Sequence, residues 1–167
     1  SQSTAMAAEQ VAEVVRTELG DAPERLFERW EPRAAASASI GQVHRASFDG
    51  RDVAVKVQYP GIEELVRSDL ATIGMLTRVS TIGTNVDGRA LADELRARIL
   101  EECDYRLEAD SQELFAGLLE REGGHVPAVV RERSAARVLT TELAQGSNIR
   151  DFAARAPKAA RDRAGEI

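Results

Sequence analysis

One lysine of this 167-residue chain stands in a segment whose residues alternate in type. Valines occupy positions 53, 55 and 57, and Lys56 falls between two of them. Such alternation of β-branched residues predicts a strand, which turns the lysine to the face opposite the valines. The Asp49-Gly50 pair before it favours a two-residue hairpin turn, with residues 42–48 as the partner strand. A lysine fixed on a strand can hold positive charge over phosphates, which is what phosphoryl chemistry needs.

The strand reads V-A-V-K, which matches a motif of protein-kinase folds in which the lysine binds nucleotide phosphates. A surface lysine on an edge strand is the alternative. Kinase folds place a glycine-rich loop ahead of this hairpin, because the backbone must approach the phosphates closely. Alanine and serine fill that loop here, so we expect a stiffer loop and altered nucleotide handling, with a plain structural turn as the alternative. The loop residues are Ala34, Ala35, Ala36, Ser37, Ala38 and Ser39.

A group of carboxylates follows between residues 101 and 108. Glu102 and Asp104 are two positions apart, so on a regular helix their directions differ by about 200° and they cannot both face one ion. Asp104 and Glu108 are one turn apart and share a face of such a helix. For Glu108, an exposed helical carboxylate without a special role is the alternative.

Composition excludes several classes of function. The net charge of −6 argues against a nucleic-acid partner, which requires a clustered basic face. The single Cys103 excludes an internal disulfide and fits a reducing compartment, so we expect a cytoplasmic protein. The chain has no run of 18 apolar residues and no signal-peptide pattern. His44 and His125 are too far apart in sequence to indicate a metal site.

Apolar spacing predicts the remaining elements. Three- and four-residue intervals indicate helices over residues 7–19, from 62 to about 79, and from 88 to about 122. A short helix from Asp21 is expected to carry Trp30 on its apolar side. Strands are predicted at 126–131 and 136–142, and a last helix at 149–156. The candidate inward positions of the long helix are Leu91, Leu95, Ile99, Leu107, Leu114, Leu118 and Leu119.

Four segments of this chain occur together, in the same order, in one family. They are AAASASIGQVH (34–44), VAVKVQYPG (53–61), EECDYRLEA (101–109) and VLTTEL (138–143). Together they closely resemble the UbiB/ADCK family of atypical kinase-like proteins, over residues 31–146. The resemblance implies an α+β fold of the protein-kinase-like small-lobe type, with an antiparallel five-stranded sheet and long helices. It divides the chain into an N-terminal helical segment (1–31), the small lobe (32–146) and the start of a large lobe (147–167).

The resemblance also assigns the site. It implies that Lys56 is oriented by Glu108 and that ATP or ADP with Mg²⁺ is bound. The Glu142 carbonyl and the Ala144 amide would contact the adenine edge, with Thr141 at the back wall. Glu102 and Asp104 match the family's E-x-D motif, which the family links to an upstream K-x-G-Q helix. No K-x-G-Q occurs in this sequence, which leaves both acids free to face solvent.

The sequence also lacks the other half of a kinase site. Residues 147–167 contain no H-R-D or D-F-G motif, so we find neither a general base nor the main Mg²⁺ ligands. We therefore expect the chain to be a piece of a longer protein, without its large lobe, and catalytically inert by itself.

For the longer protein, the resemblance implies a role in isoprenoid-quinone (ubiquinone) biosynthesis. Its partners would be quinone-biosynthesis proteins and membrane lipids, with a peripheral position at the membrane. The principal alternative is a non-catalytic interaction module whose long helices dock a partner and whose Lys56 is structural. A small-molecule phosphotransferase that shares the kinase fold is a third possibility.

Overall fold

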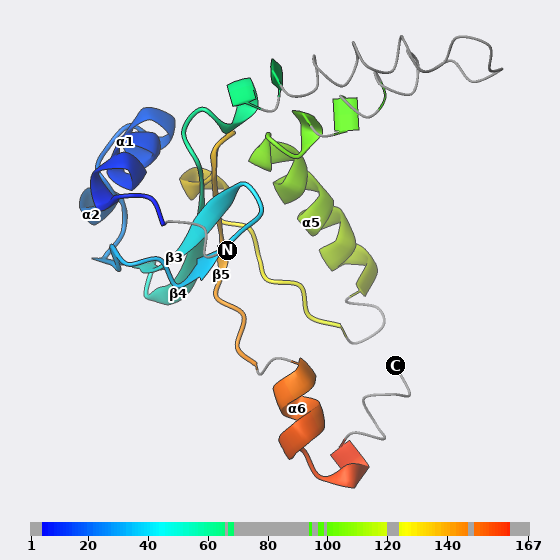
Figure 1. Ribbon diagram of the computed structural model, residues 1–167. Coiled ribbons are helices and arrows are strands. Elements are labelled where there is room, and N and C mark those ends of the chain that lie inside the picture. Colours follow the sequence, from blue (N-terminus) through cyan, green and yellow to red (C-terminus); the bar gives the residue numbers. More distant parts are fainter. Residues whose placement is uncertain are drawn as a thin grey trace, which may run out of the picture.

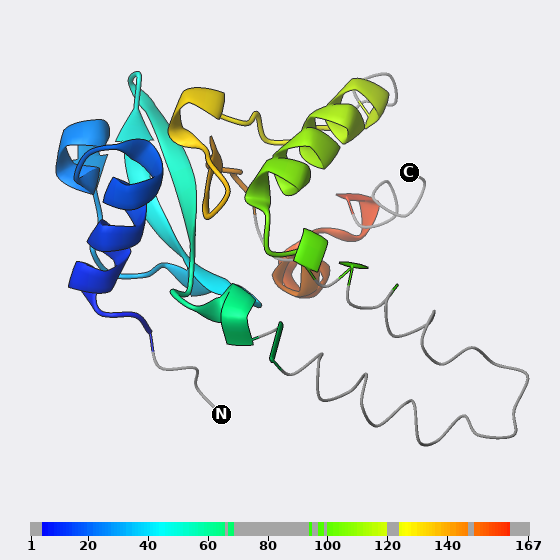
Figure 2. The same ribbon diagram turned by 90° about the horizontal axis from the view of Figure 1, so that it is seen from above.

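A single twisted sheet lies between two helical layers (Figures 1 and 2). The computed structural model describes residues 5–65, 67–68, 94, 97–98, 100–119, 124–146 and 149–160. On one face of the sheet lie α1 (Ala8–Leu19) and α2 (Pro23–Leu26), and on the other lies α5 (Tyr105–Leu119). The last helix, α6 (Ile149–Arg155), lies below the sheet in Figure 1 and confirms the helix predicted there.

The centre of the sheet is the predicted hairpin. Strands β3 (Gly41–Phe48) and β4 (Arg51–Gln58) pair antiparallel, from Gly41 opposite Gln58 to Phe48 opposite Arg51. The turn residues Asp49 and Gly50 both have positive φ, 51° and 69°. Two positive φ angles match the twist of the flanking strands, which is why Asp-Gly is favoured at this turn. The hairpin prediction is confirmed.

Three further strands complete the five-stranded antiparallel sheet, which confirms the predicted fold class. Strand β5 (Val138–Glu142) pairs with β4, whereas β1 (Arg29–Trp30) and β2 (Ala36–Ser37) pair with β3. Two expectations were wrong in detail. Trp30 is in β1 and not on a helix, because α2 already ends at Leu26. Of the strand expected at 126–131, only a single bridge forms, between Val129 and Thr141.

The main core lies on the α1 face of the sheet. The alternation along β4 turns Val53, Val55 and Val57 toward α1, and all three are buried. Burying one such side chain stabilises the fold by roughly 1.5–3 kcal/mol. Helix α1 ends at Gly20, whose φ of 89° is the left-handed conformation expected of a C-terminal glycine. The buried residues of this core are Val11, Val14, Val15, Phe27, Ala46, Val53, Val55, Val57 and Val138.

The helix predicted from residue 88 to about 122 is interrupted. Residues 102–103 form a turn, Asp104 belongs to no helix, and α5 begins at Tyr105. Asp104 accounts for the start of α5, because its Oδ1 accepts a hydrogen bond from the backbone amide of Arg106 at 3.0 Å. Of the helix predicted over 62–79, residues 62–65 and 67–68 are described and are helical.

Helix α5 faces the sheet with other residues than those predicted. Tyr105 and Ala109 are the buried positions of α5. The leucines expected to point inward are instead 41–66% exposed, and Phe115 joins them on the open side. That expectation was therefore wrong for Leu107, Leu114, Leu118 and Leu119. The other three positions, Leu91, Leu95 and Ile99, lie outside the described residues.

A buried polar network ties the N-terminal segment to the sheet. His44 is fully buried, and its ring stacks on Trp30 with the centroids 4.8 Å apart. The Glu31 carbonyl lies 2.9 Å from Nδ1 and can only accept, so Nδ1 carries the proton. The Nε2 atom then accepts from the Gln42 amide at 2.9 Å, while Gln42 Oε1 accepts from the Met6 amide. The network thus needs a neutral imidazole, and burial lowers the pKa of His44 although the Glu31 bond opposes this.

This network predicts a loss of stability in mild acid. The pKa of His44 is lowered in the fold from its usual 6.5, so the unfolded chain takes up a proton that the folded chain resists. The contribution is complete above about pH 6.5 and is lost as the pH falls through the folded-state pKa. We expect the free energy of unfolding to decrease between about pH 7.5 and about pH 5.5. Urea unfolding at each pH measures this free energy.

The matched variants are His44→Gln and His125→Gln. His44→Gln should be less stable at neutral pH and should lose less stability over the same interval. His125 is exposed and lies outside the network, so the loss of stability caused by His44 should persist in His125→Gln. Equal slopes for wild type and His44→Gln would contradict this account of the network.

Candidate functional site

Lys56 and Glu108 meet across the second face of the sheet. The Lys56 Nζ atom lies 2.8 Å from Oε1 and 2.7 Å from Oε2 of Glu108, so it donates to both carboxylate oxygens. Their side chains are 24% and 43% exposed, which places the pair at the edge of a concavity and not in the core. Lys56 comes from β4 and Glu108 from the first turn of α5, so the contact joins two elements far apart in sequence.

Several bonds hold α5 in the position that this contact needs. At its start, the Tyr105 amide donates to the Ala136 carbonyl at 2.8 Å. Just before the helix, the buried Gln58 side chain donates to the Cys103 carbonyl at 2.7 Å. Further along, Gln112 donates to the Pro127 carbonyl at 2.6 Å. The helix is therefore attached to the sheet region on both sides of Glu108.

Arg131 adds an ionic attachment from the 3₁₀ turn η2 (Arg131–Arg133). Its guanidinium donates to Glu113 through Nε and Nη2, at 2.7 and 2.6 Å, and its Nη2 also reaches Asp110. These hydrogen bonds hold the pKa of Glu113 below its usual value. Both carboxylates belong to α5, so Arg131 links the middle of this helix to the segment that leads into β5.

The concavity beside the ion pair has a volume of about 620 Å³. Its rim carries four carboxylates and one ammonium group, so its charge is negative overall. A nucleotide triphosphate would be repelled there unless a divalent cation came with it. Among the described residues, no three carboxylate, histidine or cysteine side chains are placed to hold a metal ion. The lining residues are Lys56, Glu101, Glu102, Leu107, Glu108, Asp110 and Ser111.

The strand register places further side chains on the Lys56 face. Val43 is directly opposite Lys56 on β3, and Thr141 is opposite Ala54 on β5. Because strand residues alternate between faces, all four belong to the same side of the sheet. Val43 and Ala54 offer small apolar surface next to the lysine. Neither was predicted as a site residue from the sequence, although the alternation that places Lys56 places them as well.

The alanine-rich segment is a second, short hairpin next to this face. Ala36 and Ser37 form β2 and pair with Val43 and Gln42 of β3. The chain turns between residues 38 and 41, where the Ala38 amide donates to the Gly41 carbonyl at 2.8 Å. Ala36, Val43 and Lys56 therefore stand in one row across three strands.

The two acids of the E-x-D motif are in different surroundings. Glu102 is exposed and lines the concavity with Lys56. Asp104 caps α5 and pairs with the Arg106 guanidinium, with Oδ2 2.7 Å from Nη2. The hydrogen bonds from Arg106 lower the pKa of Asp104. Asp104 is not among the residues that line the concavity, so the two acids do not share one site here.

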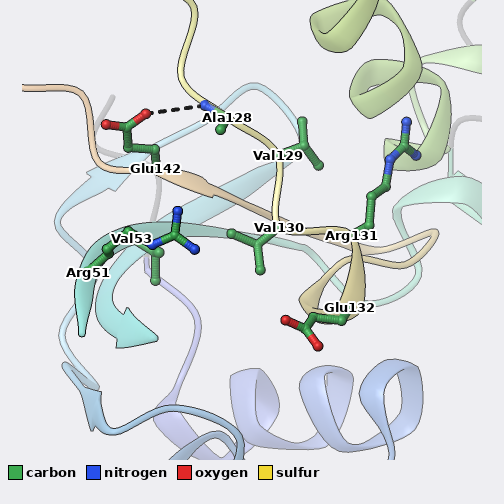
Figure 3. Close-up of a pocket in the computed structure, with 8 residues that line it drawn as sticks. All are labelled: Arg51, Val53, Ala128, Val129, Val130, Arg131, Glu132 and Glu142. Atoms are coloured by element: carbon green, nitrogen blue, oxygen red, sulfur yellow. Dashed lines mark hydrogen bonds between the residues drawn. The ribbon is translucent and has the colours of Figure 1, made fainter. Parts of the chain in front are cut away.

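Glu142 has its side chain on the opposite face. It stands across from Val53, one of the core valines, and its carboxylate lies 3.4 Å from the Ala128 amide. Figure 3 shows it at the rim of a separate pocket of about 320 Å³, which is also lined by Arg51 and residues 128–132. This pocket lacks the strand lysine. Any contact of Glu142 with a ligand on the Lys56 face would therefore come from its backbone.

Comparison with known proteins assigns the family. Residues 1–164 match the model of the ABC1 atypical kinase-like domain. The chain belongs to this family. The match includes α1 and α2, which lie before the residues 31–146 that carry the UbiB/ADCK resemblance.

Individual ABC1 relatives agree with this assignment. The chain is 38% identical over 162 residues to the mitochondrial atypical kinase coq-8 of Caenorhabditis elegans, covering 94% of this chain and 21% of the relative. It is 38% identical over 140 residues to the mitochondrial atypical kinase COQ8B of Rattus norvegicus, covering 82% and 26%. The chain thus spans between a fifth and about a quarter of these relatives. In its described residues, no helix is long and apolar enough to cross a membrane.

A solved structure shares the architecture. The Mycobacterium tuberculosis protein Rv3197, solved in complex with erythromycin, superposes with a TM-score of 0.82 at 36% sequence identity. The superposition covers 95% of this chain and 41% of that protein. The sheet and helices described above are therefore shared with this relative.

The attachment through Arg131 can be tested by hydrogen exchange. In the variant Arg131→Ala, the amides of α5 should exchange a few-fold faster, because opening of the helix no longer breaks the bonds to Asp110 and Glu113. The amides of β3 and β4 should be unaffected. Exchange followed by mass spectrometry on peptides from each element measures both. As a control, Arg16→Ala removes a surface ion pair within α1 and should leave α5 unchanged. Unaltered exchange of α5 in Arg131→Ala would show that the ionic attachment is not needed.

Proposed function

We propose that this chain binds ATP or ADP together with Mg²⁺, as the small lobe of an ABC1-type atypical kinase or ATPase. The observation that carries the proposal is the pair formed by Lys56 and Glu108 beside an open concavity. A lysine used only for solubility does not need a carboxylate from another element to hold it in place. A lysine that receives phosphates does, because it must be oriented before the ligand arrives.

In this proposal each side chain has one role. Lys56 binds phosphate oxygens, and Glu108 keeps its ammonium group directed into the concavity. The hairpin of residues 34–39 covers the phosphates. Val43 and Ala54 provide the apolar surface against which the base rests. The Glu142 carbonyl and the Ala144 amide bind the adenine edge, with Thr141 behind it.

The negative charge of the concavity supports a requirement for Mg²⁺. Glu101, Glu102, Glu108 and Asp110 surround one lysine, and a free triphosphate would add further negative charge. The bound cation neutralises part of the phosphate charge and so makes binding favourable. We therefore expect nucleotide affinity to fall strongly when Mg²⁺ is chelated.

Catalysis by the whole protein is a further part of the proposal. Phosphoryl transfer also needs a base and metal ligands from a second lobe, so we propose that this chain is inert by itself and that the large lobe is its partner. In the full-length protein, the resemblance to the UbiB/ADCK family suggests a role in isoprenoid-quinone biosynthesis. Membrane lipids and quinone-biosynthesis proteins are the proposed partners, at the cytoplasmic surface of a membrane.

A second candidate function is a non-catalytic interaction module. The observation that favours it is the open side of α5, which presents large apolar side chains to solvent. Exposed apolar patches of this kind are typical of surfaces that contact a partner. In this alternative, Lys56 only holds α5 to the sheet. The residues are Leu107, Leu114, Phe115, Leu118 and Leu119.

Titration calorimetry with Mg-ADP tests the proposal. The wild type should bind, and Lys56→Ala should bind at least about tenfold more weakly, because a hydrogen bond to a charged group contributes about 1.5–3 kcal/mol. The matched control is Lys158→Ala, since Lys158 is the only other lysine of the chain and does not line the concavity. This control should bind like the wild type.

Two results would contradict the proposal. Equal affinity in the wild type and Lys56→Ala would show that the lysine does not contact the phosphates. No binding by a wild-type chain whose folding is verified by circular dichroism would favour the interaction module.

A further inference from the structure

Tyr105 lies beneath the ammonium group of Lys56. The Nζ atom stands 4.7 Å from the centroid of the Tyr105 ring, on its face. Glu108 contacts the same nitrogen, and the two residues are three positions apart on α5. Residues at this spacing are neighbours on one helix face. One turn of α5 therefore presents an aromatic face and a carboxylate to a single lysine.

The ring is held firmly in this position. Tyr105 is 1% exposed and packs with Ala109 and Leu139 in a small second core. Its backbone amide is bonded to the Ala136 carbonyl. A Cβ at Gly41 would collide with the Val57 carbonyl and lie 3.0 Å from the Tyr105 hydroxyl, so the space around the ring is filled. The ring is therefore buried and packed where it meets the lysine.

The hydroxyl group of Tyr105 does not explain why this side chain lies here. Within the part of the chain that the structure describes, this buried oxygen has no hydrogen-bond partner. A buried hydroxyl without a partner is unfavourable, and a phenylalanine would avoid that penalty. Besides its packing in the small core, this side chain interacts favourably with the lysine through the negative face of its ring.

We propose that Tyr105 is a positioning residue for Lys56, whose ring holds the ammonium group in the orientation needed to receive phosphates. This inference rests on the proposed function, since it concerns the same lysine. Glu108 and an incoming phosphate draw on the same ammonium group, two of whose three N–H donors now contact Glu108. The ring contacts the ammonium group from a different side and carries no net charge. It therefore holds the lysine both before and after the ligand binds.

Proton NMR of lysine labelled at its ε-carbon tests the placement without any ligand. The chain has only two lysines, so two ε-CH₂ signals are expected, and Lys158→Arg assigns them. Protons over the face of an aromatic ring are shielded, so the Lys56 signal should lie upfield of the Lys158 signal. The variant Tyr105→Phe should retain the upfield position and Tyr105→Leu should lose it. A Lys56 signal that coincides with that of Lys158 in the wild type would overturn the proposal.

Calorimetry with Mg-ADP then tests the consequence for binding. Tyr105→Phe should bind like the wild type, because the ring is kept. Tyr105→Leu should bind roughly 2- to 30-fold more weakly, which corresponds to the range of cation–π energies. Wild-type affinity in a folded Tyr105→Leu would overturn the positioning role, as would equal losses in both variants.

The two measurements separate the two proposals. If the wild type binds no nucleotide, the proposed function fails while the NMR signals still decide whether the ring holds the lysine. If Tyr105→Leu does not fold, the wild type and Tyr105→Phe still provide the NMR comparison.

Discussion

The contact between Lys56 and Glu108 is the interaction on which the site depends. It is a two-oxygen contact between a strand and a helix that are 52 residues apart, so it can form only when the sheet and α5 are correctly placed. The pair is partly exposed, and pairs of this kind contribute only about 0–1 kcal/mol to stability. The pair therefore matters for where it places the ammonium group, and not for the stability of the fold. The stronger interactions of the fold lie elsewhere, and they bring these two groups together.

The two faces of the sheet differ: one packs against the main core, and the other carries the candidate site. Toward α1 it presents valines and a buried network around His44, in which each ring nitrogen has a fixed partner. Toward α5 it presents Lys56 among small side chains, beside a negatively charged concavity. The alternation of β4 is what makes both faces possible from one strand. A shift of one residue in its register would bury the lysine and expose the valines.

Local patterns predicted the hairpin well and the long helix poorly. The period of two and the Asp-Gly turn are direct consequences of strand geometry, so β3 and β4 could be placed from sequence. Helical periodicity does not show a break of one turn, and the leucines after residue 104 were therefore assigned to the wrong side. Asp104, a favoured residue at the start of a helix, was the available signal. The two-residue strand that holds Trp30 depends on pairing with β3, which a local pattern does not reveal.

Only part of the candidate site could be predicted from the sequence. Alternation indicated which way Lys56 points, but its partner Glu108 came from the family resemblance, because several nearby carboxylates look alike in sequence. Tyr105 was not singled out, since an aromatic residue on a helix indicates a core position and not a contact with a lysine. Its contact arises because α5 packs against β5, beside the lysine of β4, and no spacing rule gives this arrangement.

The most direct test of this account is a double-mutant cycle on the ion pair, built from Lys56→Met, Glu108→Gln and the double variant. The free energy of unfolding in urea gives the coupling between the two side chains. We expect a coupling of about 0.5–1 kcal/mol, larger than that of the surface pair Arg16–Glu13 within α1, where about 0.2–0.5 kcal/mol is expected. A coupling of zero, with all variants folded, would mean that the two groups do not hold each other and would contradict the account.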